Sequence, residues 1–171
     1  MKIDLHVHSR SGSDGRWPLE QIFPEAARRG IGLISITDHD SLQAQKEAHQ
    51  RARRHGIRYL TGVELNVTLV HDRWTRGKTA SLDFLGYGFD VENRPLNKKL
   101  DELRGYRKRR AQMILDNLNE EFRREGSQLF TERDMEAIEA SVDGSFGRPH
   151  IASYLISRGI VASKQEAFDR Y

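Results

Sequence analysis

The stretch Ile31-Gly32-Leu33-Ile34-Ser35-Ile36-Thr37-Asp38-His39-Asp40 is a nearly continuous apolar run that ends in ionisable residues. Such runs are typical of strands buried on both faces of a parallel sheet. Before it, residues 2–7 alternate apolar and polar side chains, which is the period-two pattern of a strand. Between the two, residues 18–29 are predicted to form a helix, with Gly30 as its C-terminal cap. Strand, helix and strand in this order predict a βαβ unit.

Two more strands are predicted downstream of this unit. A second helix is expected to end near Arg54, and residues 57–67 and 79–89 are predicted as the third and fourth strands. Strands that alternate with helices indicate a parallel sheet. We therefore expect residues 1–92 to form an α/β domain built on a parallel βαβ sheet.

The pattern changes from strands to helices after Asp90. From residue 96 to about residue 124, apolar side chains recur at helical spacing. Thr131 and Ser163 are placed as N-caps of two further short helices. Residues 93–171 are therefore expected to form a mainly helical insertion.

The composition excludes several kinds of site and partner. The 171 residues contain no cysteine, which removes disulfides, thiolate zinc sites and cysteine nucleophiles. A net charge of +3 is too small for a protein that coats nucleic acid, so no stable binding of duplex DNA is expected. No apolar run approaches the roughly 20 residues of a membrane span, and the first residues lack the apolar segment of a signal peptide. We expect no membrane association and a cytoplasmic location.

Side chains that can bind metal ions stand near the ends of the successive predicted strands. His6 and His8 end the first strand, His39 follows the second, and Glu64 and Asp83 lie in the third and fourth. Residues two apart on a strand point the same way, so both histidines of the first strand can reach one ion. Unpaired ionisable groups in a closed core are costly, whereas a divalent ion would neutralise their clustered charge. The sequence therefore predicts a divalent-metal site with nitrogen and oxygen ligands.

Other charged residues have more than one interpretation. Asp4 and Asp38 are candidates for accepting hydrogen bonds from metal-bound imidazoles, but Asp38 could equally cap the following helix. The basic cluster at residues 51–54 is expected to be a solvated helix face. A histidine or aspartate at a single strand end is usually a turn or capping residue, and only the coincidence at several ends favours a metal.

Four motifs in this order resemble the polymerase and histidinol phosphatase (PHP) family. They are Asp4-Leu5-His6-Val7-His8-Ser9, Ser13-Asp14-Gly15, Ile36-Thr37-Asp38-His39-Asp40 and Gly62-Val63-Glu64. The resemblance covers about the first 90 residues. It implies part of a distorted seven-stranded β/α barrel, two or three divalent metal ions and hydrolysis of phosphoesters by metal-activated water.

Two further segments look most like one branch of this family. Leu85-Gly86-Tyr87 and Gly147-Arg148-Pro149-His150-Ile151-Ala152 resemble stand-alone phosphoesterases that act on nucleoside 3′,5′-bisphosphates and on the 5′ ends of short RNA. The resemblance implies a small nucleotide or short RNA as substrate. It also implies Mn²⁺ as the favoured ion, with Zn²⁺ or Fe²⁺ as alternatives.

The resemblance also assigns roles to individual residues. The metal ligands would be His6, His8, Asp14, His39 and Glu64, with Glu64 bridging two ions. Arg148 and His150 would act at the substrate phosphate as catalytic residues, although both could simply belong to the start of a helix. Arg107 and Arg110 would bind the substrate phosphate.

The sequence departs from the family pattern at three points. The loop from His8 to Asp14 is one residue longer than in many relatives, which bears on the alignment of Asp14. Relatives usually have a histidine where Asp83 stands, and a carboxylate there favours manganese or magnesium over zinc. The family's later ligands, a histidine and an Asp-x-His, have no counterpart because no histidine follows His150. We therefore expect the chain to be part of a longer polypeptide, or to need a partner or self-association, and to have little activity alone.

Two competing hypotheses follow from these departures. The first is a PHP-fold metallohydrolase with another substrate, such as histidinol phosphate, because one fold hosts many chemistries. The second is a non-catalytic or incomplete module that keeps only the early ligands.

Overall fold

The first three strands form the predicted parallel sheet in the computed structural model, which describes residues 1–141 and 147–171. β1 (Lys2–Val7) pairs in parallel with β2 (Ile31–Ile36), and β2 pairs in parallel with the short β3 (Arg58–Tyr59). The strands predicted at residues 2–7 and 31–36 are confirmed with the same bounds.

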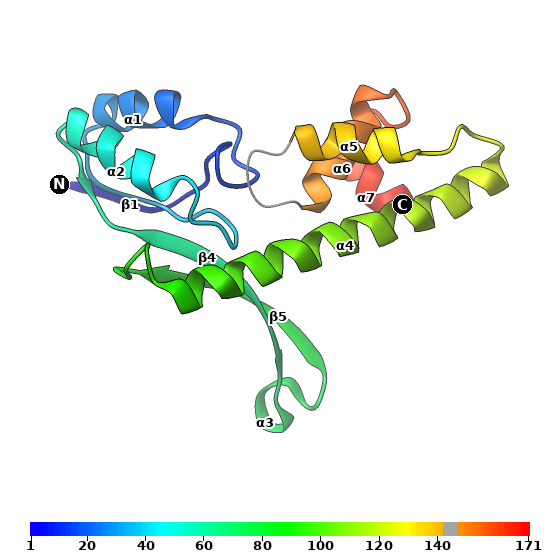
Figure 1. The fold of residues 1–171 in the computed structure, drawn as a ribbon, viewed down its shortest axis with the longest axis horizontal. Coiled ribbons are helices and arrows are strands. Elements are labelled where there is room, and N and C mark those ends of the chain that lie inside the picture. Colours follow the sequence, from blue (N-terminus) through cyan, green and yellow to red (C-terminus); the bar gives the residue numbers. More distant parts are fainter. Residues whose placement is uncertain (142–146) are drawn as a thin grey trace.

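Two helices connect these strands and close the core of this part of the chain (Figure 1). They are α1 (Leu19–Arg28) and α2 (Gln45–Arg54). Their buried side chains form one apolar cluster with β2, which includes Leu19, Phe23, Ile34, Ile36 and Ala48. α1 and α2 pack on the apolar side chains of β2 and so fix the position of this strand. The polar residues that directly follow β2 are therefore also held in place.

The predicted third strand is two strands, and the fourth runs in the opposite direction. After β3 the chain forms β4 (Gly62–Val70), which pairs antiparallel with β5 (Thr79–Tyr87). The expectation of a parallel sheet throughout residues 1–92 is therefore wrong. Residues 71–78, which include the short helix α3 (Asp72–Thr75), are fewer than the roughly dozen residues of a parallel crossover. The β4–β5 hairpin projects from the molecule with α3 at its tip (Figure 1).

A backbone bridge joins the parallel sheet to this hairpin. His39 and Glu64 form an isolated parallel bridge, in which the Asp40 N–H donates to the Glu64 carbonyl at 2.8 Å. The Glu64 N–H donates to the Asp38 carbonyl at 3.2 Å. The bridge places Glu64 directly beside the end of β2.

The buried side chain of Gln45 strengthens the same junction. Its Nε2 donates to the carbonyls of Ile36 and Gly62, each at 2.8 Å, and its Oε1 accepts from the Tyr59 hydroxyl at 2.7 Å. One amide therefore ties the end of β2 to the start of β4.

The second half of the chain is helical, as predicted. Its elements are α4 (Arg94–Glu125), α5 (Glu132–Ala140), α6 (Arg148–Ser157) and α7 (Lys164–Arg170). Thr131 and Ser163 are the predicted N-caps of α5 and α7. Its role as an insertion into a seven-stranded barrel stays a prediction.

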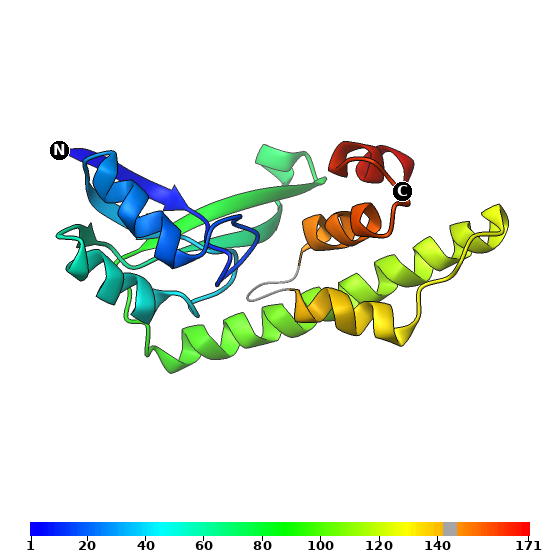
Figure 2. The same ribbon diagram turned by 90° about the horizontal axis from the view of Figure 1, so that it is seen from above.

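The long helix α4 connects two separate apolar clusters. Its first half passes beside the sheet, and its second half carries α5, α6 and α7 (Figures 1 and 2). The helical cluster contains Leu115, Phe122, Ile138 and Leu155 and shares no residue with the cluster around β2. Within the described residues, no helix has both the length and the apolar character needed to cross a membrane.

Candidate metal centre

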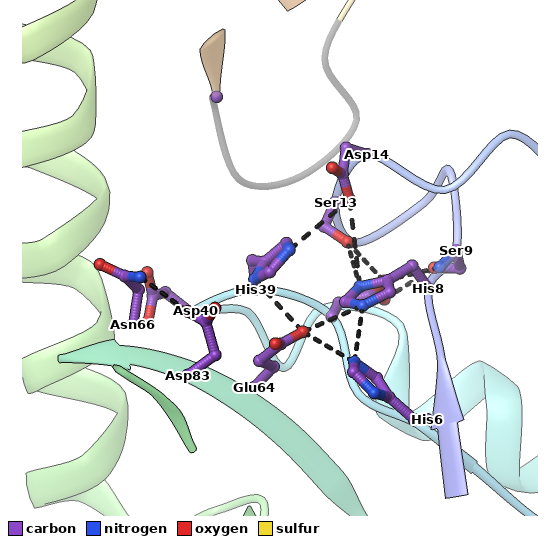
Figure 3. Close-up of polar contacts among 12 residues, drawn as sticks. His6, His8, Ser9, Ser13, Asp14, His39, Asp40, Glu64, Asn66 and Asp83 are labelled. Carbon is purple, nitrogen blue, oxygen red and sulfur yellow. Dashed lines mark hydrogen bonds and ion pairs between the residues drawn. The ribbon is translucent and has the colours of Figure 1, made fainter. Parts of the chain in front are cut away.

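Three histidines surround one carboxylate where β1, β2 and β4 come together (Figure 3). Oε2 of Glu64 lies 3.0 Å from Nε2 of His6, 3.0 Å from Nε2 of His8 and 3.4 Å from Nδ1 of His39. The Nε2 atoms of His6 and His8 are 3.1 Å apart. The Glu64 side chain is only 5% exposed, so its carboxylate is largely removed from water and is surrounded by imidazole nitrogens.

Asp14 adds a second group of ligand atoms next to the first. Its Oδ1 lies 3.8 Å from Nε2 of His39 and 4.0 Å from Nδ1 of His8. The rings of His8 and His39 stack with centroids 4.5 Å apart. The structure thus brings together His6, His8, Asp14, His39 and Glu64 as two groups that share His8.

The arrangement fits a divalent metal ion. Ligand atoms about 2.1 Å from a tetrahedral ion are roughly 3.4 Å from each other, close to the separations around Glu64. The buried Nδ1 of His39 makes no hydrogen bond within the described residues and is available as a ligand. Burial, helped by His39, lowers the pKa of His8 and favours the neutral imidazole that binds metals.

A buried carboxylate fixes the loop between the first ligands. Asp38 accepts hydrogen bonds from the Ser9 N–H at 2.7 Å, the Ser9 hydroxyl at 2.7 Å and the Ser13 hydroxyl at 2.8 Å. A Cβ at Gly12 would lie 1.8 Å from Oδ2 of Asp38, so the turn requires glycine. Burial raises the pKa of Asp38, and the hydrogen bonds from Ser9 and Ser13 oppose that rise.

Neither aspartate considered for the imidazoles is shown in that role. Asp38 holds the loop and does not cap α2, whose N-cap is Ala44. Asp4 accepts from the backbone N–H of His6 at 3.4 Å. The serines and glycine of Ser9-Arg10-Ser11-Gly12-Ser13 are the signal in the sequence that could have indicated a loop folded around a carboxylate.

Asp83 does not join the described groups of ligands. It stands opposite Asn66 in the hairpin, two positions along from the Glu64–Leu85 pair, and accepts a hydrogen bond from Nδ2 of Asn66 at 2.6 Å. The expectation that Asp83 lies near the end of a parallel strand beside the other ligands is wrong, because β5 is antiparallel and Asp83 lies in its middle. The side chain is exposed.

Arg107 reaches the metal centre from α4. Its guanidinium donates through Nε to Oδ2 of Asp40 at 2.8 Å, and Nη2 donates to the same oxygen. The Asp40 side chain is 3% exposed, and its backbone has a φ of 48°, which is unusual for a residue other than glycine. Oδ1 of Asp40 is buried without a hydrogen bond in the described part of the chain. Arg107 therefore contacts Asp40, the residue that follows His39 in the chain.

The other predicted residues lie on α4 and α6. Arg110 is exposed and lines, together with Arg148, a cavity of about 550 Å³ between α4, α6 and α7. Nδ1 of His150 accepts from the Gly147 N–H at 3.0 Å, so the ring also supports the helix start. Burial lowers the pKa of His150, and the nearby charge of Asp14 opposes this. The hydrogen bond with Gly147 also opposes this lowering of the His150 pKa.

The Asp40–Arg107 pair should show energetic coupling. We expect Asp40→Asn and Arg107→Gln to be non-additive, with a coupling energy of about 1–2 kcal/mol, because each leaves the other's charge partly buried and unpaired. Urea unfolding of the wild type, both single variants and the double variant measures it. The exposed Lys108–Glu139 pair is the control, with an expected coupling below about 0.5 kcal/mol. Additive effects at Asp40 and Arg107 would contradict the pairing.

Fold and site together define an α/β protein with a histidine–carboxylate metal centre. The chain belongs to the PHP domain family, whose model matches residues 4–157. It is 30% identical over 178 residues to a 3′,5′-nucleoside bisphosphate phosphatase from Chromobacterium violaceum, covering 99% of this chain and 54% of that protein. It is 28% identical over 170 residues to a 5′-3′ exoribonuclease from Haemophilus influenzae, covering 99% and 56%.

Solved structures have the same fold. One is described as an amidohydrolase from Chromobacterium violaceum with bound sulfate and no metal; it has a TM-score of 0.76 and 29% identity, over 99% of this chain and 54% of that one. Another, from Bifidobacterium adolescentis and described as a metal-dependent phosphoesterase, has a TM-score of 0.78 and 25% identity, with the same coverage. The chain spans about half the length of the relatives that it matches along its whole length.

Proposed function

We propose that the protein is a divalent-metal-dependent phosphoesterase that hydrolyses phosphomonoesters of nucleotides. The substrates would be nucleoside 3′,5′-bisphosphates or the 5′ ends of short RNA; the relatives are named 3′,5′-nucleoside bisphosphate phosphatase and 5′-3′ exoribonuclease. The observation that carries the proposal is the buried Glu64 carboxylate facing three imidazoles, next to the second group that contains Asp14.

The histidine and carboxylate side chains of the two ligand groups would bind the divalent ions. Two adjoining groups of ligand atoms favour the binding of at least two ions. Glu64 would bridge them. The family resemblance implies a total of two or three ions. Imidazole and carboxylate ligands suit Mn²⁺, with Zn²⁺ and Fe²⁺ as alternatives. Bound ions would supply an acidified water and charge stabilisation at the phosphate oxygens.

Positive charge and hydrogen-bond donors would hold the phosphate beside these ligands. Arg107 is fixed along one edge by Asp40, which leaves Nη1 as a donor for a phosphate oxygen. Arg110 and Arg148 lie together at the cavity between α4 and α6 and would extend the anion contacts. In the tautomer in which Nδ1 of His150 accepts from the Gly147 N–H, Nε2 carries the proton and would donate to substrate.

Phosphate release by the full-length gene product tests the proposal. Adenosine 3′,5′-bisphosphate and a 5′-phosphorylated short RNA are supplied with Mn²⁺, with and without EDTA, and histidinol phosphate is the comparison substrate. We expect release from the nucleotides that EDTA abolishes. No release with Mn²⁺, or release insensitive to EDTA, would refute the proposal. A strong preference for histidinol phosphate would favour the competing substrate class.

A further inference from the structure

The tip of the β4–β5 hairpin presents a tryptophan to solvent. Trp74 on α3 is 73% exposed, although large aromatic side chains are usually well buried. Its ring stacks on His71 with centroids 4.5 Å apart. Nδ1 of His71 accepts from the N–H groups of Arg73 at 3.2 Å and Trp74 at 3.4 Å, which fixes the stacked pair. The indole therefore offers one face on a rigid support.

Three cations and one carboxylate, Asp72, share the short segment that carries this ring. Arg73, Arg76 and Lys78 are all exposed, and no ion pair involves any of them within the described residues. Elsewhere, Arg51 and Arg124 are paired with carboxylates of their own helices. An exposed aromatic ring alone would not identify a partner. An exposed ring together with unpaired cations suits a partner that has both flat aromatic groups and many negative charges.

Single-stranded nucleic acid has this combination of features. Its bases stack on aromatic side chains and its phosphates pair with lysine and arginine. We propose that the hairpin tip, defined as residues 71–78, binds single-stranded RNA by stacking a base on Trp74 and pairing phosphates with the three cations. The tip projects into open space in Figure 1, so a strand can approach it.

The position of the tip has a consequence for substrate length. Glu64 and Val70 are six positions apart along β4, which is roughly 20 Å at the rise of a strand. A mononucleotide at the metal centre cannot also reach the tip, whereas a longer RNA can contact both. Binding at the tip stands on its own geometry, and its use in guiding substrate rests on the proposed function.

Tryptophan fluorescence tests the stacking directly. The 171 residues contain two tryptophans, and Trp17→Phe leaves Trp74 as the reporter among them; the same protein carrying Trp74→Phe as well supplies the background that isolates the Trp74 signal. The full-length gene product carrying Trp17→Phe is titrated with an oligouridine of roughly a dozen nucleotides, within the range of single-strand site sizes. EDTA is present throughout, so that no hydrolysis occurs. We expect quenching of the fluorescence that saturates with the bound fraction, and absence of quenching overturns the proposal.

Two variants separate stacking from charge. Trp74→Ala is expected to weaken oligouridine binding about tenfold, as measured by fluorescence anisotropy of labelled RNA. Arg73→Gln, Arg76→Gln and Lys78→Gln together should reduce the slope of log affinity against log salt by about 2. The matched control, Arg53→Gln, Arg54→Gln and Lys98→Gln, removes the same charge from exposed positions on α2 and α4. An equal effect of the control would show that only net charge matters and would overturn the proposal.

Two other results would also overturn it. If Trp74→Ala abolished binding to phosphatidylserine vesicles and left RNA binding unchanged, the tip would be a membrane contact. If it lowered the melting temperature and left RNA binding unchanged, Trp74 would be a packing residue. Because binding is measured in EDTA, these outcomes are independent of whether the metal centre hydrolyses nucleotides.

Discussion

Glu64→Gln is expected to lower the affinity for Mn²⁺ by at least about 100-fold and phosphate release by roughly 1,000-fold. The amide keeps the size of the side chain, but it removes the negative charge that lies between the three imidazoles. The backbone bridge between His39 and Glu64 is unaffected, so the variant should fold. Isothermal titration with Mn²⁺ and the phosphate assay measure the two effects.

A thermal shift gives a second readout for Glu64 that needs no substrate. An ion that binds only the folded state raises the melting temperature, so Mn²⁺ should stabilise the wild type and not Glu64→Gln. Glu136→Gln, at an exposed position on α5, is the matched control and should retain the shift. A normal Mn²⁺ shift in Glu64→Gln would show that the ion binds without this carboxylate.

Asp38→Asn should destabilise the fold by about 3 kcal/mol, the second largest effect that we expect. The Asp38 carboxylate accepts hydrogen bonds from one N–H and two hydroxyl groups through both of its oxygens. An asparagine has only one acceptor oxygen, and its NH₂ group would face the donors of Ser9 or Ser13. Loosening of residues 9–13 should also reduce Mn²⁺ affinity, because this loop lies between His8 and Asp14.

Urea unfolding measures the loss of stability at Asp38. The control is Asp101→Asn on α4, where an exposed ion pair with Arg104 should contribute no more than about 0.5 kcal/mol. An unchanged urea midpoint for Asp38→Asn would mean that the loop keeps its conformation without the buried carboxylate. Reduced Mn²⁺ affinity at unchanged stability would instead place Asp38 closer to the ions than its contacts indicate.

Features with a short-range pattern could be predicted from the sequence. β1 and β2 were predictable because alternation and a continuous apolar run are local signals, and both strands have the predicted bounds. His6 in β1 and His8 just after it share one face for the same reason. Strand direction is different, because residues 79–87 would have the same composition in a parallel or an antiparallel strand. Only the short connection at residues 71–78 decides between them, and Asp83 was misplaced in consequence.

Contacts between distant residues could not be predicted in this way. Asp40 meets Arg107 across 67 positions, and Gln45 bonds to the carbonyls of two strands, without any periodicity that indicates either. The polar residues between the two predicted strands indicate only a turn, because the sequence does not show that Trp74 lacks a packing partner. Such features depend on where the chain brings elements together.

The separation of the two apolar clusters divides the molecule into different cooperative units. A cluster that shares no residue with its neighbour can open by itself, as foldons do in native-state hydrogen exchange. If α5, α6 and α7 detach first, the second half of α4 loses its cover while the sheet persists. Amide protons in residues 111–122 should then exchange through a sub-global opening, at lower denaturant than those of β2. The metal ligands on the sheet would then stay folded at denaturant concentrations at which Arg148 and His150 on α6 have already lost their packing. Ion binding would therefore persist at denaturant concentrations that abolish catalysis.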